Sequence, residues 1–138
     1  MTFEELQALI DSKDIIVEEL PETSLDEASY FGRIFARSGG VTAAVEEAVK
    51  ELNPEGFTFN PITCDGFDKC RPALMRASKG LMKDYNFIEG MICSGGCIGG
   101  AGCLTHGEAN KKGVEKYGND STAETIKGAI ERAEEKGV

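Results

Sequence analysis

The chain has 138 residues, enough for one domain with its own core but for little besides. Its net charge of −9, with one histidine and no tryptophan, argues against a nucleic-acid partner, because binding phosphate requires cationic groups. No apolar run approaches the ~20 residues that a membrane span needs, and the N-terminus lacks the pattern of an export signal. We therefore expect a soluble, cytoplasmic protein without a membrane partner.

The N-terminal part is strongly acidic and is predicted to contain two helices and one strand. Thr2 and Glu5 have the spacing of a capping box, and apolar residues follow at helical intervals. Residues 15–20 (IIVEEL) have the composition of a short strand, whereas residues 21–30 are polar and expected to be irregular. A glycine turn then leads into an amphipathic helix over residues 41–52. We interpret the acidic stretch as a solvated surface, with a docking role as the alternative.

The middle of the chain is predicted to be a βαβ unit. Residues 57–64 are strand-like, although Pro61 indicates a bulge or an edge position. A helix is expected over residues 67–83 and a second strand over residues 86–93. Because a helical crossover of this length joins parallel strands, the two strands are expected to be parallel. The buried side of the helix is expected to carry Leu74, Ala77 and Leu81.

Two further helices are expected in the C-terminal part of the chain. The first covers residues 108–116, and the second follows a capping box formed by Ser121 and Glu124. The sequence therefore predicts an α/β fold, with a small, mainly parallel sheet and flanking helices.

Five cysteines lie in the middle of the chain, at positions 64, 70, 93, 97 and 103. A secreted module held by disulfides usually spreads its cysteines along the whole chain, so this clustering favours metal binding or thiol chemistry. Cys64 and Cys93 close the two predicted parallel strands. The carboxyl ends of such strands share one edge of a sheet, where open α/β folds place their sites. Four or five thiols can therefore converge at this edge.

Cys93 and Cys97 form the most specific cysteine pair. Two thiolates at this spacing can bind two corners of an iron–sulfur cube if the backbone between them folds back tightly. The residues between them include Gly95 and Gly96, which permit such a fold and a close approach to an inorganic cluster.

The other candidate ligands have simpler interpretations. For Cys64 and Cys70 we favour a role as small core residues, because free cysteine is among the most buried residue types. For Cys103 the core and ligand interpretations are equally weighted. His106, the one histidine, is interpreted as a solvated loop residue, with a ligand or proton-carrier role as the alternative.

Two segments resemble motifs of the [FeFe]-hydrogenases. The sequence FIEGMICSGGCIGGAG, residues 87–102, resembles the third cysteine motif of that family, E-x-M-x-C-x-G-G-C-x-x-G-G-G-Q-P. The sequence FARSGGVTAA, residues 35–44, resembles the family's F-G-x-T-G-G-V-M-E-A. The resemblance covers roughly residues 1–105 and implies the C-terminal lobe of the hydrogenase catalytic domain. Residues 106–138 are then a helical C-terminal extension that packs on this lobe.

The resemblance implies a cofactor and residue roles. In the family, four cysteines hold a [4Fe-4S] cluster, and one of them bridges to a two-iron subcluster; together these form the H-cluster, which reversibly reduces protons to dihydrogen. By position, Cys93 is implied as a ligand of the [4Fe-4S] cluster and Cys97 as the bridging ligand. Met91 is implied beside the two-iron unit, and Phe35 and Ala36 in the wall of its pocket.

The sequence also departs from the family pattern. The first two cysteine motifs, T-S-C-C-P and M-P-C-x-x-K, are absent, and Ala101, Cys103 and Leu104 replace the usual Gly, Gln and Pro. Ala36 replaces the glycine of the Phe-Gly pair. We therefore expect the chain to be inactive alone and to need two partners: the upstream half of the same domain, and a ferredoxin-like domain or protein as electron carrier.

Two alternatives from other functional classes remain. In the first alternative, the chain is a self-contained module that binds zinc or a [4Fe-4S] cluster through Cys64, Cys70, Cys93 and Cys97. In the second, it is a regulatory domain that senses redox state or hydrogen without turnover.

Overall fold

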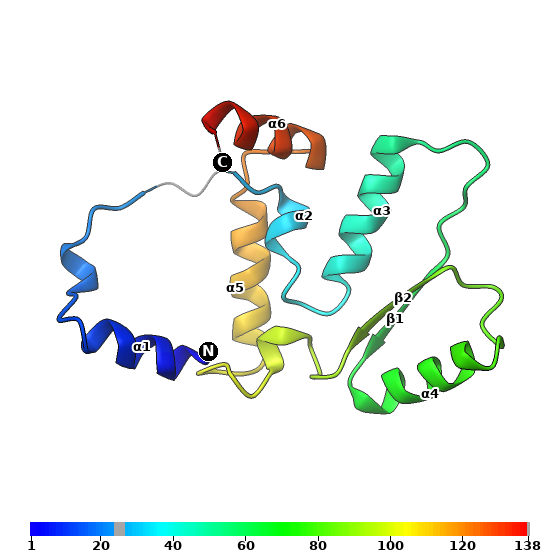
Figure 1. The fold of residues 1–138 in the computed structure, drawn as a ribbon, viewed down its shortest axis with the longest axis horizontal. Coiled ribbons are helices and arrows are strands. Elements are labelled where there is room, and N and C mark those ends of the chain that lie inside the picture. The colour runs from blue at the N-terminus through cyan, green and yellow to red at the C-terminus, as the bar shows by residue number, and fades with distance from the viewer. Residues whose placement is uncertain (24–26, 138) are drawn as a thin grey trace.

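The computed structural model describes residues 1–23 and 27–137, and part of the predicted irregular stretch over residues 21–30 lies outside them. Figure 1 shows an α/β arrangement in which helices flank a small sheet, as predicted. Among the described residues, no helix is both long and apolar enough to cross a membrane. The elements in chain order are α1 (Phe3–Asp11), the 3-10 turn η1 (Val17–Glu19), α2 (Tyr30–Arg33), α3 (Gly40–Leu52), β1 (Pro61–Asp65), α4 (Phe67–Ser78), β2 (Phe87–Met91), the 3-10 turn η2 (Cys97–Gly99), α5 (Glu108–Asn119) and α6 (Ile126–Lys136).

The sheet consists of β1 and β2, which are parallel and joined by α4, so the predicted βαβ unit is confirmed. Pro61 pairs with Phe87 and Asp65 pairs with Met91. The first strand begins at Pro61 and not at residue 57, because a residue without an N–H fits best at the start of a strand.

The predicted buried face of α4 was wrong. Cys70 and Ala73 are its buried residues, whereas Leu74 and Leu81 are 57% and 60% exposed and Leu81 lies beyond the end of the helix. The residues that meet the sheet are small, which allows α4 to approach the strands closely. Ala77 is half-buried at the edge of this contact.

The N-terminal arm, residues 1–23, contains α1 and η1; it begins beside the loop before α5, where the Phe3 N–H donates to the carbonyl of Gly102, and the rest of it extends away from that loop (Figure 1). The predicted capping box is present, since Thr2 accepts a hydrogen bond from the Glu5 backbone and Glu5 accepts one from the Thr2 backbone. The strand predicted over residues 15–20 was wrong. These residues pair with no strand, and the backbone N–H of Leu20 donates instead to the carbonyl of Val17 across η1.

The amphipathic helix predicted over residues 41–52 is confirmed as α3, which starts one residue earlier. The last helix starts later than predicted. Thr125, and not Ser121, is the N-cap of α6, and its hydroxyl accepts from the backbone of Gly128. The hydroxyl of Ser121 donates instead to the carbonyl of Ala28. Ser121, which the local pattern predicted as the cap, therefore forms a hydrogen bond with the distant carbonyl of Ala28 instead.

Helix α5 packs on α2 through both apolar and charged groups. Ile34, at the end of α2, is fully buried, and Gly118 of α5 lies against it. Arg37 pairs with Glu115 of α5 at 2.9 Å, and the hydroxyl of Tyr30 donates to the same carboxylate at 2.8 Å. Burial opposes the charge on Arg37, but the hydrogen bond to Tyr30 and the charge of Glu115 outweigh it and raise the Arg37 pKa.

This packing predicts opposite effects for two glycine substitutions in α5. A Cβ at Gly118 would lie 2.8 Å from Cγ2 of Ile34 and 2.9 Å from the ring of Tyr30, whereas a Cβ at Gly113 would meet nothing within 4 Å. We expect Gly118→Ala to reduce the free energy of unfolding by ~1–3 kcal/mol through overpacking. Gly113→Ala should be neutral or stabilise by up to ~1 kcal/mol, because alanine favours helix. Urea unfolding of both variants tests this, and equal midpoints would contradict it.

Candidate metal centre

The candidate site is the loop that follows β2. It starts at the carboxyl edge of the sheet, and two hydrogen bonds fix it there. The backbone N–H of Gly66 donates to the carbonyl of Met91 at 2.8 Å, and the backbone N–H of Gly95 donates to the Asp65 carboxylate at 2.7 Å. The loop is therefore attached to the ends of both strands.

The loop also lies against the segment before α3, so the two segments with family motifs are side by side. The Ser38 N–H donates to the carbonyl of Gly95 at 3.0 Å, and the Ile98 N–H donates to the carbonyl of Ala36 at 3.2 Å. Gly96 is buried between them with φ of 92°, and a Cβ there would lie 2.5 Å from the Ser38 nitrogen. No other residue fits this contact without moving the backbone.

Three of the five cysteines lie around the turn at η2. Cys93 and Cys97 are exposed, and Cys103 is half-buried. The thiol of Cys103 donates to the carbonyl of Cys97 at 3.2 Å. Gly100 lies close to both Cys93 and Cys97. A Cβ at Gly100 would lie 3.4 Å from the Cys93 sulfur and 3.1 Å from the Cys97 carbonyl oxygen.

An apolar pocket of about 470 Å³ adjoins this turn. Cys97, Cys103, Ala36 and Phe3 are among the residues that line it. Gly95 lines a second pocket of about 500 Å³, which the charged residues Arg37, Asp65 and Lys111 also line.

Several predicted site residues line neither of these two pockets, among them Phe35, Met91, Cys93 and Gly96. Phe35 is 48% exposed, and Met91 is half-buried at the end of β2. The structure therefore brings Ala36 and Cys97 together in the lining of one pocket.

Cys64 and Cys70 belong to the core, where they pack with Ala73. The Cys70 thiol donates to the carbonyl of Cys64 at 3.2 Å. Burial raises the pKa of the Cys64 thiol, and the nearby Cys70 adds to the effect. Both side chains are thus part of the packing between α4 and the sheet.

The described residues do not form a complete metal centre by themselves. Among the described residues, no group of three or more histidine, cysteine, aspartate or glutamate side chains is arranged to hold a metal ion. Cys93 and Cys97 nonetheless fit as two ligands of a larger site, since both are exposed and a Cβ at Gly95 between them would meet nothing within 4 Å. His106 contacts the same loop, with its Nε2 2.9 Å from the carbonyl oxygen of Gly100.

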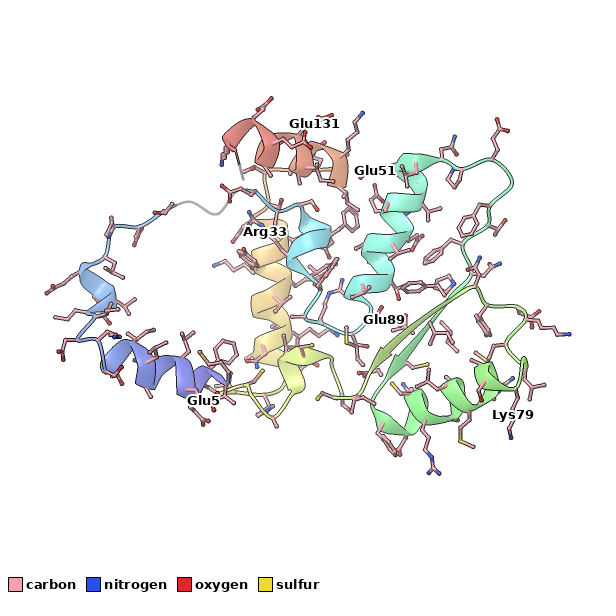
Figure 2. All side chains as sticks on the ribbon, in the orientation of Figure 1. Glu5, Arg33, Glu51, Lys79, Glu89 and Glu131 are labelled. Atoms are coloured by element: carbon pink, nitrogen blue, oxygen red, sulfur yellow. The ribbon has the colours of Figure 1, made fainter. Side chains whose placement is uncertain are left out.

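Sequence reasoning missed the structural role of Glu89. This β2 residue is 4% exposed, and its carboxylate accepts from the backbone N–H groups of Gly39 and Thr42, each at 2.8 Å, and from the Thr42 hydroxyl. Figure 2 shows it at the start of α3. The signal was available, because an acidic residue inside an otherwise apolar strand requires hydrogen-bond partners.

These exposures predict the order in which the thiols react. In the native chain at neutral pH, Cys93 and Cys97 should be alkylated first, Cys103 more slowly, and Cys64 and Cys70 only after unfolding. Peptide mapping after timed alkylation measures this order, and the guanidinium-unfolded chain, in which all five should react, is the control. Native labelling of Cys64 or Cys70 at the rate of Cys93 would contradict it.

Residues 1–101 match the family described as "Iron only hydrogenase large subunit, C-terminal domain". No curated protein matches the chain in sequence. The matched region runs from α1 through η2 and contains the 35–44 segment, all but the last residue of the 87–102 segment and the four cysteines up to Cys97, whereas Cys103, α5 and α6 lie outside it. Because the match covers well over half of the chain, the chain belongs to the C-terminal domain family of iron-only hydrogenase large subunits.

Proposed function

We propose that this chain is the second lobe of a hydrogenase catalytic domain and that Cys93 and Cys97 supply two of the four thiolates of a [4Fe-4S] cluster. The observation that carries the proposal is the pair of exposed thiols on a loop that is hydrogen-bonded to the 36–38 segment. Thiolates are the ligands that iron–sulfur clusters require. In this proposal Cys97 also bridges to a two-iron unit.

The cluster, when bound, would relay electrons and supply the iron site for the reversible reduction of protons to dihydrogen. The contribution of this chain is to bind and to exclude water. Cys93 and Cys97 hold the group, and Gly95 and Gly96 let the backbone approach it closely. Ala36 and the apolar pocket beside Cys97 keep water away from one side, while Phe35 and Met91 complete the surroundings once the other lobe is present.

The proposed partner is the upstream half of the same domain. Support comes from the N-terminal arm, none of whose helical residues is buried. Large exposed apolar surfaces on a folded chain usually mark an interaction site. The exposed large apolar side chains of the arm are Met1, Phe3, Leu6, Leu9, Ile15, Ile16, Val17 and Leu20. A ferredoxin-like carrier is proposed as the source of electrons.

A thiol sensor is the second candidate function. It is favoured by Cys103, whose thiol contacts the Cys97 backbone and which lines the same pocket as Cys97. The metal module that needs Cys64 and Cys70 is disfavoured, because both thiols are in the core.

Single cysteine variants of the complete two-lobed protein test the ligand assignment. We expect Cys93→Ala and Cys97→Ala to abolish cluster content, since no water or backbone group replaces a soft thiolate, and Cys97→Ala also to release the two-iron unit. Cys64→Ala and Cys70→Ala should cost only ~1–3 kcal/mol of packing, and Cys103→Ala should retain iron. Iron quantification and electron paramagnetic resonance measure the outcome. Equal iron loss in Cys64→Ala and Cys93→Ala would favour the metal module.

The isolated 138-residue chain should produce no hydrogen. It carries only two of the proposed ligands in an exposed position, and four are needed to hold the cluster. Gas chromatography after anaerobic maturation tests this, with the two-lobed protein as the positive control. Hydrogen evolution by the isolated chain would refute the two-lobe proposal.

A further inference from the structure

Glu89 caps α3 from a distant part of the chain. Most helix N-termini are capped by a neighbouring side chain, but the N-cap of α3 is Gly39, which has no side chain to offer. The carboxylate of Glu89, fifty positions away in β2, takes this role by accepting from Gly39 and Thr42. Its charge is favoured by the N-terminal dipole of a 13-residue helix and by charge-assisted hydrogen bonds.

These hydrogen bonds close a ring around the candidate site. Glu89 is hydrogen-bonded to the start of α3, and residues 36–38, just before α3, are hydrogen-bonded to loop residues 95–98. The loop is joined through Cys93 to β2, the strand that contains Glu89. Every link in the ring is either a peptide bond or a hydrogen bond of 3.2 Å or less. Releasing Glu89 therefore removes one of the contacts that hold the segment with Ala36 against the loop with Cys97, while the Arg37–Glu115 pair and the direct hydrogen bonds remain.

We propose that Glu89 is a positioning residue, which sets the separation between the Cys93–Cys97 loop and the Ala36 side of the pocket. The role of this separation in holding a cluster rests on the proposed function of Cys93 and Cys97. The alternative is that Glu89 only stabilises α3, as any cap does.

The chain offers a matched control in Glu51. This carboxylate also caps a helix from a distance, by accepting from the backbone N–H groups of Ile126 and Lys127 at 2.7 and 2.9 Å at the start of α6. Figure 2 shows Glu51 at the end of α3 opposite to Glu89. Both Glu→Gln changes remove one negative charge from a helix N-terminus, but only Glu89 belongs to the ring.

Amide hydrogen exchange of the 138-residue chain tests the inference. In Glu89→Gln, exchange of the Ser38 and Ile98 N–H groups should accelerate roughly tenfold or more, as expected when a hydrogen bond to a charged group is lost. The amides that join β1 to β2 should change less. In Glu51→Gln, Ser38 and Ile98 should exchange as in the original chain. Equal effects of both variants, or no change at Ser38 and Ile98 in Glu89→Gln, would overturn the proposal.

A second pair of variants covers the case in which Glu89→Gln does not fold. Thr42→Val removes the hydroxyl donor to Glu89 but keeps the backbone N–H, so it should accelerate the same two amides severalfold, whereas Thr42→Ser should restore slow exchange. No difference between the two would also overturn the proposal. Iron content in the two-lobed protein is measured separately. If Cys93→Ala and Cys97→Ala retain iron while Ser38 and Ile98 respond to Glu89→Gln, the cluster proposal fails and the positioning of the loop stands.

Discussion

The close backbone contact between residues 36–38 and residues 95–98 is the constraint on which the site depends. Hydrogen bonds in both directions require the two segments to approach within about 3 Å, and Gly96 is the residue whose missing side chain allows this. A second close approach lies within the first segment, at Gly40, where a Cβ would lie 2.0 Å from the carbonyl oxygen of Ile34. Gly96 thus serves the contact between the two segments, and Gly40 serves the turn that leads from α2 into α3.

The core of the chain is small for its length. Most of the buried apolar residues are alanine or cysteine, and among the described residues Ile34 is the one large side chain that is fully buried. Many larger apolar side chains, including most of those in the N-terminal arm, remain exposed. Since burial of apolar surface is the main driving force of folding, a chain of this kind gains stability when another lobe covers it. This is the physical reason to expect a two-lobed protein.

Local sequence patterns predicted those elements whose partners are close in the chain. The βαβ unit, α1 with its capping box and α3 all follow from signals within a few residues of each element. The errors occurred where a distant group decided the outcome. Residues 15–20 have strand composition but no neighbouring strand, Ser121 bonds to Ala28, and α4 buries Cys70 because the strands it covers leave room only for small side chains.

The candidate site was predictable in part for the same reason. The C-x3-C spacing and the glycines identified the loop that carries Cys93 and Cys97 from sequence alone. The contact of this loop with residues 36–38 was not predictable from spacing, because it joins segments more than fifty positions apart. The capping role of Glu89 was not predicted, because it depends on the position of α3, which the sequence of the strand does not encode.

The loop is held on two further sides by groups outside the family match. The side-chain amide of Asn110, in α5, donates to the carbonyl of Ile98 at 3.1 Å, and His106 contacts the carbonyl of Gly100. The glycines of this loop carry a large ordering entropy, and hydrogen bonds within the chain itself offset part of it on folding. A cluster that binds to Cys93 and Cys97 then meets a loop whose backbone is already arranged, so less of its binding free energy is spent on ordering. Helix α5, through Asn110, and His106 just before it thereby restrain the loop from outside the matched region.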